Sequence, residues 1–342
     1  MIDISIPSHE RVVKAELAPG IFSIIAIHNT ARGPALGGLR FFPYANDEDA
    51  LKDVLSLSEA MSYKAALADL PLGGGKAVIM GDPEKIKSPE LLLAFADFVN
   101  ILEGKYITAK DVGLKLEDLD TIATRTKFVA GTTKGGSGDP SPMTAYGVFC
   151  GIKAAAQYVW KTDSVKGLRV FVEGLGSVGY ELARLIAKEK GVVYGYDLHP
   201  EVITRAQEEL GLIPMDPKKW AHFDLWSPCA MGGVVQAHNI PQLSRHGVRV
   251  VAGAANNQLS NEQADGWRLH REWVLYAPDY IINSGGLINV ATELQGYDRK
   301  KVMQKVEKIG PLLLEIFARA RKEDHPTTYI SHAMALERLR KI

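Results

Sequence analysis

A glycine-rich segment near the middle of the chain constrains the fold more than any other feature. The sequence GLGSVG occupies residues 174–179, between an apolar run typical of a buried strand and a segment with helical spacing of its apolar residues. In this context Gly174 permits a tight turn, Gly176 lets a pyrophosphate approach the backbone, and Gly179 allows close packing of helix on strand. The segment therefore predicts the first strand–turn–helix unit of a doubly wound, Rossmann-type sheet that binds a dinucleotide.

The residue that ends the next expected strand indicates which dinucleotide is bound. Asp197 follows the last glycine at close to the spacing of about 20 residues that this fold shows. A carboxylate there can bind both ribose hydroxyls and repel a 2′-phosphate, and no arginine follows it directly. We therefore expect NAD rather than NADP. Glu173, just before the first glycine, is unusual because it adds a negative charge near the phosphates. The expected cofactor residues of this region are Gly174, Gly176, Ser177, Val178, Gly179 and Asp197.

The pattern of elements indicates two bodies joined by a loop. After residue 144 strands and helices alternate regularly, which favours a parallel, doubly wound sheet. The segment TTKGGSGDPSP at residues 132–142 has the punctuation of a loop or hinge. A length of 342 residues corresponds to about two domains. Expected strands lie at residues 21–27, 77–80, 106–108, 169–172, 192–196, 223–226, 248–252 and 274–276, and expected helices at residues 49–65, 88–102, 117–126, 144–160, 177–190, from 298 with a break at Gly310-Pro311, and from about 327.

Composition excludes several classes of protein. Lys plus Arg and Asp plus Glu each number 40, so no basic surplus favours nucleic acid or an anionic membrane as partner. Cys150 and Cys229 are too few for a disulfide framework or a zinc cluster, and no HExxH or other ligand-spaced set predicts a metal. No basic and apolar leader opens the chain, and no apolar run approaches the roughly 20 residues that span a bilayer. We expect a cytoplasmic protein without a metal.

The candidate chemical residues are weak signals when taken singly. GGGK at residues 73–76 fails the nucleoside-triphosphate loop template at both flanks, so we reject that function. Lys76 could be a solvated turn lysine, Lys64 a helix-end cation, and Asp111 a loop cap. The pattern around these three residues leaves each alternative open.

Six short motifs form a set when they are taken together. They are GPALGGLR (33–40), MSYK (61–64), LGGGKAV (72–78), ITAKDVG (107–113), AGAANNQL (252–259) and PDYIINSGGLINV (278–290). With the GLGSVG segment they resemble the Glu/Leu/Phe/Val amino-acid dehydrogenase family over nearly the whole chain, above all its leucine, phenylalanine and tryptophan dehydrogenases. The resemblance implies reversible, NAD-dependent conversion of an L-amino acid to its 2-oxo acid and ammonia.

The resemblance also implies roles for individual residues. Lys64 would hold the substrate α-carboxylate, Lys76 would activate water and polarise the carbonyl, and Asp111 would move protons at the amine. The chemistry agrees, because hydride leaves the α-carbon only when the amine is neutral, and a desolvated lysine near another cation can act as a base. Gly37 and Gly38 would offer backbone groups to the substrate with Asn256 orienting it, and Thr144, Cys229, Ala230, Asn257 and Asn283 would line the cofactor site.

The expected side-chain subsite is apolar. It comprises Leu36, Ala109, Leu287 and Val290, among which an acidic substrate side chain would be buried without a partner. Ala109 resembles the leucine-type enzymes, whereas Leu287 resembles the aromatic-type enzymes. One methylene in such a pocket changes discrimination by only about 1–3 kcal/mol. We expect a branched-chain aliphatic substrate, with an aromatic one as the alternative.

The resemblance finally implies an architecture and an assembly. We expect an α/β protein with a cleft between a substrate-binding and catalytic domain, residues 1–134, and a Rossmann NAD-binding domain, residues 135–319. A C-terminal helix at about residues 320–342 would pack back on the first domain. The C-terminus is shorter than in leucine dehydrogenases, which favours a homodimer over an octamer. A dehydrogenase for another substrate, such as a 2-hydroxy acid, and a non-catalytic NAD-binding sensor are the alternatives.

Overall fold

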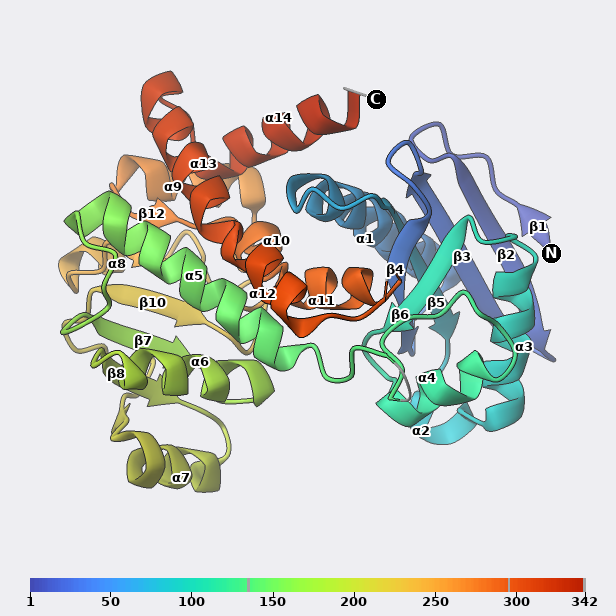
Figure 1. Cartoon of the computed structure of the whole chain (residues 1–342), viewed down its shortest axis with the longest axis horizontal. Helices are drawn as coiled ribbons and strands as arrows, with labels where there is room; N and C mark the ends of the chain where they lie inside the picture. The colour runs from blue at the N-terminus through green and yellow to red at the C-terminus, as the bar shows by residue number, and fades with distance from the viewer. Residues whose placement is uncertain (134–135, 295, 341–342) are drawn as a thin grey trace. The chain divides into compact units, whose positions relative to one another are not determined.

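The computed structural model describes residues 1–133, 136–294 and 296–340, which form two compact units (Figure 1). The first unit comprises Met1–Pro140, Asn289–Asp298 and Ala335–Ile342, and the second comprises Ser141–Ile288 and Arg299–Met334.

The chain therefore enters the first unit three times. It leaves after Pro140, inside the glycine- and proline-rich segment. Within the last returning segment, Arg338 donates to the carbonyl of Leu67 at 2.7 Å and to that of Ala66 at 3.4 Å. The domain ranges expected from the sequence remain a prediction.

The first unit is a mixed six-stranded sheet with the order β1-β2-β3-β5-β4-β6. β4 runs parallel to β5 and β6, whereas the β1–β2, β2–β3 and β3–β5 pairs are antiparallel. Helix α1 packs on one face, and α3 and α4 pack on the other. The elements are β1 (Ile2–Asp3), β2 (Arg11–Ala18), β3 (Ile21–Asn29), β4 (Ala35–Phe42), α1 (Asp47–Leu67), β5 (Gly73–Met80), α2 (Pro83–Ile86), α3 (Pro89–Asn100), β6 (Tyr106–Lys110) and α4 (Leu116–Ala123).

Local signals explain the helices of this unit. The side chain of Asn46 caps α1, whose first turn carries three acidic residues and whose last turn carries Lys64, as the helix dipole favours. The Ser88 side chain caps α3, and Pro89 lies in its first turn.

The triple glycine corrects one expectation. Residues 73–76 lie inside β5, not in a turn before a strand at residues 77–80. A Cβ at Gly73 would stand 1.9 Å from the Asn29 carbonyl oxygen, and one at Gly74 would stand 2.0 Å from the Ser62 nitrogen. Glycine is disfavoured in strands, but here the neighbouring backbone leaves room for nothing larger.

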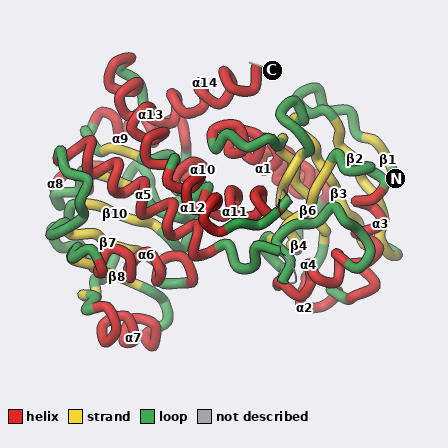
Figure 2. Tube along the Cα trace, viewed as in Figure 1, coloured by secondary structure: helices red, strands yellow, loops and turns green. Residues whose placement is uncertain are grey.

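The second unit is an all-parallel six-stranded sheet with the order β12-β11-β10-β7-β8-β9 (Figure 2). β7, the first of these strands in the chain, lies between β8 and β10, which is the doubly wound arrangement expected from the sequence. The elements are α5 (Ser141–Trp160), β7 (Arg169–Glu173), α6 (Ser177–Lys188), β8 (Val192–Tyr196), α7 (Pro200–Leu210), β9 (Ile213–Pro214), β10 (Leu225–Pro228), α8 (Ile240–Arg245), β11 (Val250–Val251), α9 (Glu262–Arg271), β12 (Leu275–Tyr276), α10 (Asp279–Ile282), α11 (Gly285–Glu293), α12 (Arg299–Glu307), α13 (Ile309–Glu323) and α14 (Thr327–Arg340). Of these, α11 and α14 begin in the second unit and end in the first.

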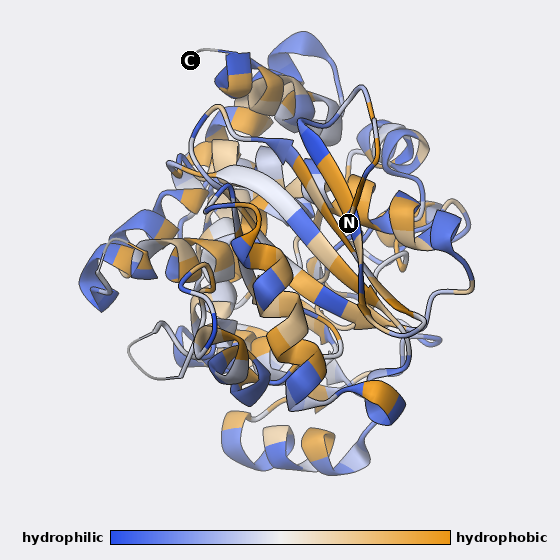
Figure 3. Ribbon diagram, turned by 90° about the vertical axis from the view of Figure 1, so that its right-hand side faces the viewer, coloured by the Kyte–Doolittle hydropathy of each residue, from blue (hydrophilic) through white to orange (hydrophobic). Residues whose placement is uncertain are grey.

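The helices of this unit follow their hydrophobic pattern. Figure 3, in which the first unit faces the viewer, shows hydrophilic and hydrophobic residues alternating along helices, as helices with one packed face do. The break expected at Gly310-Pro311 falls at Lys308, between α12 and α13. Pro311 then lies in the first turn of α13, where its missing N–H costs no helical hydrogen bond.

The described residues contain neither a candidate membrane span nor a cluster of metal-ligating side chains. No helix there is long and apolar enough to cross a membrane. No group of three His, Cys, Asp or Glu side chains in the same part of the chain is arranged to hold a metal ion.

Candidate active site

Several predicted residues share one face of the first unit's sheet. β4 lies between β5 and β6, and the register sets Gly38 level with Lys76 on one side and Ala109 on the other. Because side chains alternate along a strand, these residues and Asp111 face the side that α1 covers. Leu36, two residues before Gly38, belongs to the same face and is buried.

Lys76 and Asp111 meet across the intervening strand. The Lys76 Nζ lies 2.5 Å from the Asp111 Oδ2, and Lys76 is only 6% exposed. A Cβ at Gly38 would stand 2.8 Å from the Asp111 Cβ. Gly38 therefore provides the space through which a lysine and a carboxylate from the flanking strands form an ion pair.

A second cation, Arg40, forms an ion pair with the Asp111 carboxylate. The Arg40 Nε lies 3.2 Å from the Asp111 Oδ2, and its Nη1 lies 3.0 Å from the Asp53 Oδ2 on α1. Tyr44 donates to that Asp53 oxygen at 2.6 Å. Burial alone would raise the pKa of Asp111, but the charges of Lys76 and Arg40 outweigh burial and hold this pKa below its ordinary value. Asp111 is therefore an ionised carboxylate at neutral pH.

The sequence analysis missed Arg40, Asp53 and Tyr44. The GPALGGLR motif contains Arg40, and strand alternation would have set it on the face of Gly38, two residues earlier. Its glycines do not favour a strand, however, and the contact with Asp111 depends on strand order.

The other predicted substrate residues of the first unit have varied surroundings. The carbonyl of Gly37 accepts a hydrogen bond from the Tyr106 hydroxyl at 2.6 Å. Lys64 is half-buried in the last turn of α1. Val290, in the part of α11 that belongs to this unit, would lie 3.9 Å from a Cβ at Gly131. Their roles remain predictions.

In the second unit, the three glycines of the GLGSVG segment meet different constraints. Gly174 has a φ of +100°, and its Cβ would stand 2.5 Å from the Ala230 Cβ. A Cβ at Gly179 would stand 1.9 Å from the Gly174 carbonyl oxygen, so only glycine allows this helix–strand contact. A Cβ at Gly176 would meet nothing within 4 Å. Space is therefore open at the one glycine where a pyrophosphate is expected.

The segment also lies where ligands bind in doubly wound sheets. β7 and β10 are adjacent, and beyond them the strand order runs in opposite directions. Gly174 follows β7, and Cys229 and Ala230 follow β10, so both groups lie at the carboxyl ends of the strands at the switch point. In the described structure no side chain caps α6 at Gly176, which leaves the first amides of α6 for an anion.

Two carboxylates flank the glycines differently. Asp197 accepts hydrogen bonds from the backbone amides of Leu175 at 2.7 Å and His199 at 3.0 Å, which fixes it at the end of β8. Glu173 accepts from the Trp226 Nε1 at 2.8 Å. Burial raises the pKa of the Glu173 carboxyl, and this hydrogen bond offsets the effect only in part.

The remaining predicted residues of this unit lie on neighbouring loops and helices. The Asn283 Nδ2 donates to the Asn256 Oδ1 at 2.7 Å and to the Ala254 carbonyl at 3.0 Å. Asn257 has a left-handed backbone with a φ of 52°. A Cβ at Gly285 would stand 3.2 Å from the Thr144 Cα, so α5 and the start of α11 touch there. Leu287 lies on α11 and is half-buried.

This combination of features defines a class. A dinucleotide-binding fold with open space at its central glycine shares a chain with a buried lysine–aspartate pair, as in a dinucleotide-dependent oxidoreductase. Residues 9–128 match the family described as Glu/Leu/Phe/Val dehydrogenase, dimerisation domain, and residues 135–197 and 188–341 match Glutamate/Leucine/Phenylalanine/Valine dehydrogenase. The chain belongs to this family of amino-acid dehydrogenases, which generally depend on NAD(P).

Individual relatives agree with the family. Leucine dehydrogenase of Geobacillus stearothermophilus is 45% identical over 94% of this chain and 87% of that protein. L-tryptophan dehydrogenase of Nostoc punctiforme is 43% identical over 94% of this chain and 90% of its own. The crystal structure of L-tryptophan dehydrogenase from Nostoc punctiforme has a TM-score of 0.85 at 40% identity, and the match covers 97% of this chain and 96% of that one.

Proposed function

We propose that the chain catalyses reversible, NAD-dependent oxidative deamination of a hydrophobic L-amino acid, with branched-chain aliphatic substrates preferred over aromatic ones. The observation that carries the proposal is the buried ion pair of Lys76 and Asp111 across Gly38. The names of the leucine and tryptophan dehydrogenases among the relatives support a hydrophobic substrate.

The residues of the first unit would divide the chemistry among them. The Lys64 cation would pair with the substrate α-carboxylate as a point charge. The Lys76 ammonium would polarise the carbonyl of the 2-oxo acid, and neutral Lys76 would take a proton from water in deamination. Asp111 would carry protons to and from the substrate nitrogen. Arg40 would keep Asp111 ionised and oriented, because it binds both that carboxylate and Asp53.

The second unit would hold the dinucleotide, which supplies the hydride acceptor when it is bound. The amides at the start of α6 and the open space at Gly176 fit a pyrophosphate. Asp197 would bind the adenosine ribose and repel a 2′-phosphate, which favours NAD over NADP. Thr144, Cys229, Ala230, Asn257 and Asn283 would line the rest of this site.

The apolar residues expected to contact the substrate side chain favour a hydrophobic substrate without deciding its size. Leu36 and Ala109 share the sheet face of Lys76. Leu287 and Val290 are three residues apart on α11, which is helical spacing for a common face. Neither pair contains a cation that could bind an acidic side chain.

A homodimer is the assembly that we propose, with an octamer as the alternative. The family description of residues 9–128 as a dimerisation domain supports this proposal. Light scattering that shows a stable monomer would contradict both states.

The proposed function is tested by NADH formation at alkaline pH with L-leucine, L-valine, L-isoleucine, L-phenylalanine, L-tryptophan and L-glutamate, each also with NADP. We expect turnover with the branched-chain substrates to exceed that with the aromatic ones, little turnover with glutamate, and preference for NAD. Faster turnover with an aromatic substrate would correct the subsite. Absence of turnover with all six, while NADH still binds, would instead favour the sensor.

A further inference from the structure

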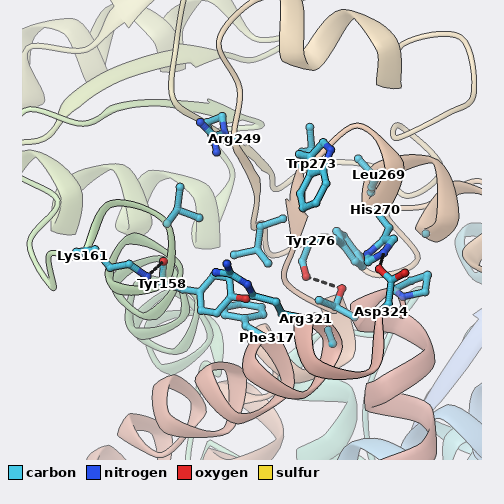
Figure 4. A pocket seen from close by; sticks show the side chains of 17 residues that line it. Tyr158, Lys161, Arg249, Leu269, His270, Trp273, Tyr276, Phe317, Arg321 and Asp324 are labelled. Carbon is cyan, nitrogen blue, oxygen red and sulfur yellow. Dashed lines mark hydrogen bonds and ion pairs between the residues drawn. The ribbon is translucent and has the colours of Figure 1, made fainter.

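A cavity of about 540 Å³ lies inside the second unit, away from the glycine-rich segment. It is found where β11 and β12 begin, whereas the GLGSVG segment lies at the carboxyl ends of the strands. Residues from the ends of α5, α9 and α13 also line it (Figure 4). Its volume is within the range of about 300–1,000 Å³ that small-molecule sites occupy, and the proposed dehydrogenase chemistry assigns it no role.

Part of the cavity lining is apolar and buried, but one aromatic side chain of the lining is exposed to solvent. Leu269, Val274 and Phe317 are each at most 3% exposed. Trp273, by contrast, is 82% exposed and has a left-handed backbone with a φ of 55°. A left-handed backbone is strained at a tryptophan, and a side chain this exposed contributes little to the hydrophobic core. Its indole therefore presents a flat apolar surface at the cavity.

The charges at the cavity are unbalanced. The side chains of Arg249 and Arg321 make no hydrogen bond or ion pair with any residue in the described part of the chain. Asp324 is the one carboxylate among the described lining residues, and its Oδ1 lies 3.0 Å from the His270 Nε2. The cavity therefore has an excess of positive charge over negative charge.

Helix dipoles explain only some of this charge. Lys161 donates to the Tyr158 carbonyl at 2.8 Å, so it compensates the C-terminal end of α5. Arg321 lies in the last turn of α13 and gains from the same effect. Arg249 precedes β11 and lies in no helix, so no helix dipole of its own element favours its charge, although the ends of α5, α9 and α13 line the same cavity.

We propose that this cavity binds a small organic anion that has a planar ring. The ring would stack on Trp273 over the apolar lining, and the carboxylate or phosphate would pair with Arg249 and Arg321, which form charge-assisted hydrogen bonds with such groups. Figure 4 shows these three side chains around the same space, each from a different part of the unit. An aromatic carboxylate and a nucleoside monophosphate share this chemistry.

Calorimetric titrations of the protein distinguish an aromatic carboxylate from a nucleoside monophosphate. The ring-bearing probes are indole-3-acetate and adenosine monophosphate, and the ring-free probe is inorganic phosphate. We expect one ring-bearing anion to bind below about 1 mM, and phosphate at least about tenfold more weakly. Trp273→Ala, Arg249→Gln and Arg321→Gln should each weaken that binding about tenfold. Lys322→Gln, the matched control, removes a neighbouring charge that does not line the cavity and should change nothing.

Three results of these titrations would overturn the proposal. The first is that neither ring-bearing anion binds, and the second is that inorganic phosphate binds equally tightly. The third is that binding is unchanged in all three variants, which is the result expected if adenosine monophosphate binds in the dinucleotide site instead. A change of oligomeric state in Trp273→Ala would also overturn it, since the exposed indole would then belong to an interface. Trp273→Phe keeps a ring and should retain binding, which separates loss of stacking from loss of folding.

Discussion

The two glycine-rich regions of this chain use the same residue for different physical reasons. In the first unit, Gly38, Gly73 and Gly74 lie in strands and are required because neighbouring atoms stand where a Cβ would be. In the second unit, Gly174 needs its left-handed backbone, and Gly176 faces open space. Glycine in the first region allows protein groups to approach one another, whereas at Gly176 it leaves room for a ligand. The first region is therefore expected to serve chemistry and the second to serve binding.

The largest expected effect sharpens this division. Lys76→Ala removes the proposed base and should lower kcat by about 10³-fold or more, while NADH affinity stays near its original value. Steady-state kinetics and NADH fluorescence titration measure the two quantities. Lys85→Ala, which changes an exposed lysine of the same unit, is the control and should alter neither. Turnover near the original rate in the Lys76 variant would refute the assignment.

A smaller effect is expected from the cation behind Asp111. Arg40→Gln removes a charge 3.2 Å from that carboxylate, so the pKa of Asp111 should rise and the acid side of the pH profile of kcat/KM should move to higher pH. We expect a loss of about tenfold at neutral pH, with partial recovery in Arg40→Lys, which keeps the charge without the fork of donors.

Stability gives a second readout for Arg40. A carboxyl whose folded pKa is lowered stabilises the fold above its unfolded pKa, and this contribution disappears as pH falls through the folded pKa. Arg40→Gln should therefore lower the free energy of unfolding at neutral pH more than in acid. A pH profile of kcat/KM that keeps its shape in Arg40→Gln would make Arg40 a purely structural residue.

The smallest expected effect concerns the carboxylate next to the GLGSVG segment. Glu173 has a raised pKa because of burial, so its ionised form destabilises the fold above that pKa. Glu173→Gln can still accept from Trp226 and should raise the free energy of unfolding at pH about 8, with no gain at pH about 4. Chemical denaturation at both pH values measures this.

NADH affinity shows whether the charge of Glu173 affects binding at the GLGSVG segment. Because its carboxylate accepts from the Trp226 indole, we expect Glu173→Gln to change NADH affinity by less than about twofold. Much tighter binding in the variant would mean that this charge acts on the phosphates.

The geometry around the GLGSVG segment was predictable from the sequence because its rules are local, and binding at this segment stays a prediction. The turn at Gly174, the uncapped start of α6 and Asp197 at the end of β8 follow one another along the chain, and the family resemblance added Cys229 and Ala230. The structure sets these groups at the carboxyl ends of β7, β8 and β10, which are neighbours in the parallel sheet.

The site around Gly38, Lys76 and Asp111 in the first unit was less predictable, because its geometry depends on strand order. Glycine is disfavoured in strands, so the sequence did not predict that residues 73–76 lie in β5. Arg40 and Asp111 are 71 residues apart, and their contact exists only because β4 and β6 pair in parallel. The sequence identifies Lys76 and Asp111 only through the family resemblance, and the strand register explains how they meet.

The most direct test of this account measures turnover and NADH affinity in Gly38→Ala and Gly176→Ala side by side. Gly38→Ala should displace Asp111 and lose most turnover while it binds NADH normally. Gly176→Ala should fold normally, since nothing lies within 4 Å of its new Cβ, and should bind NADH more weakly. If Gly38→Ala binds NADH more weakly and keeps its turnover, or if Gly176→Ala binds NADH unchanged, the division of labour between the two regions is wrong.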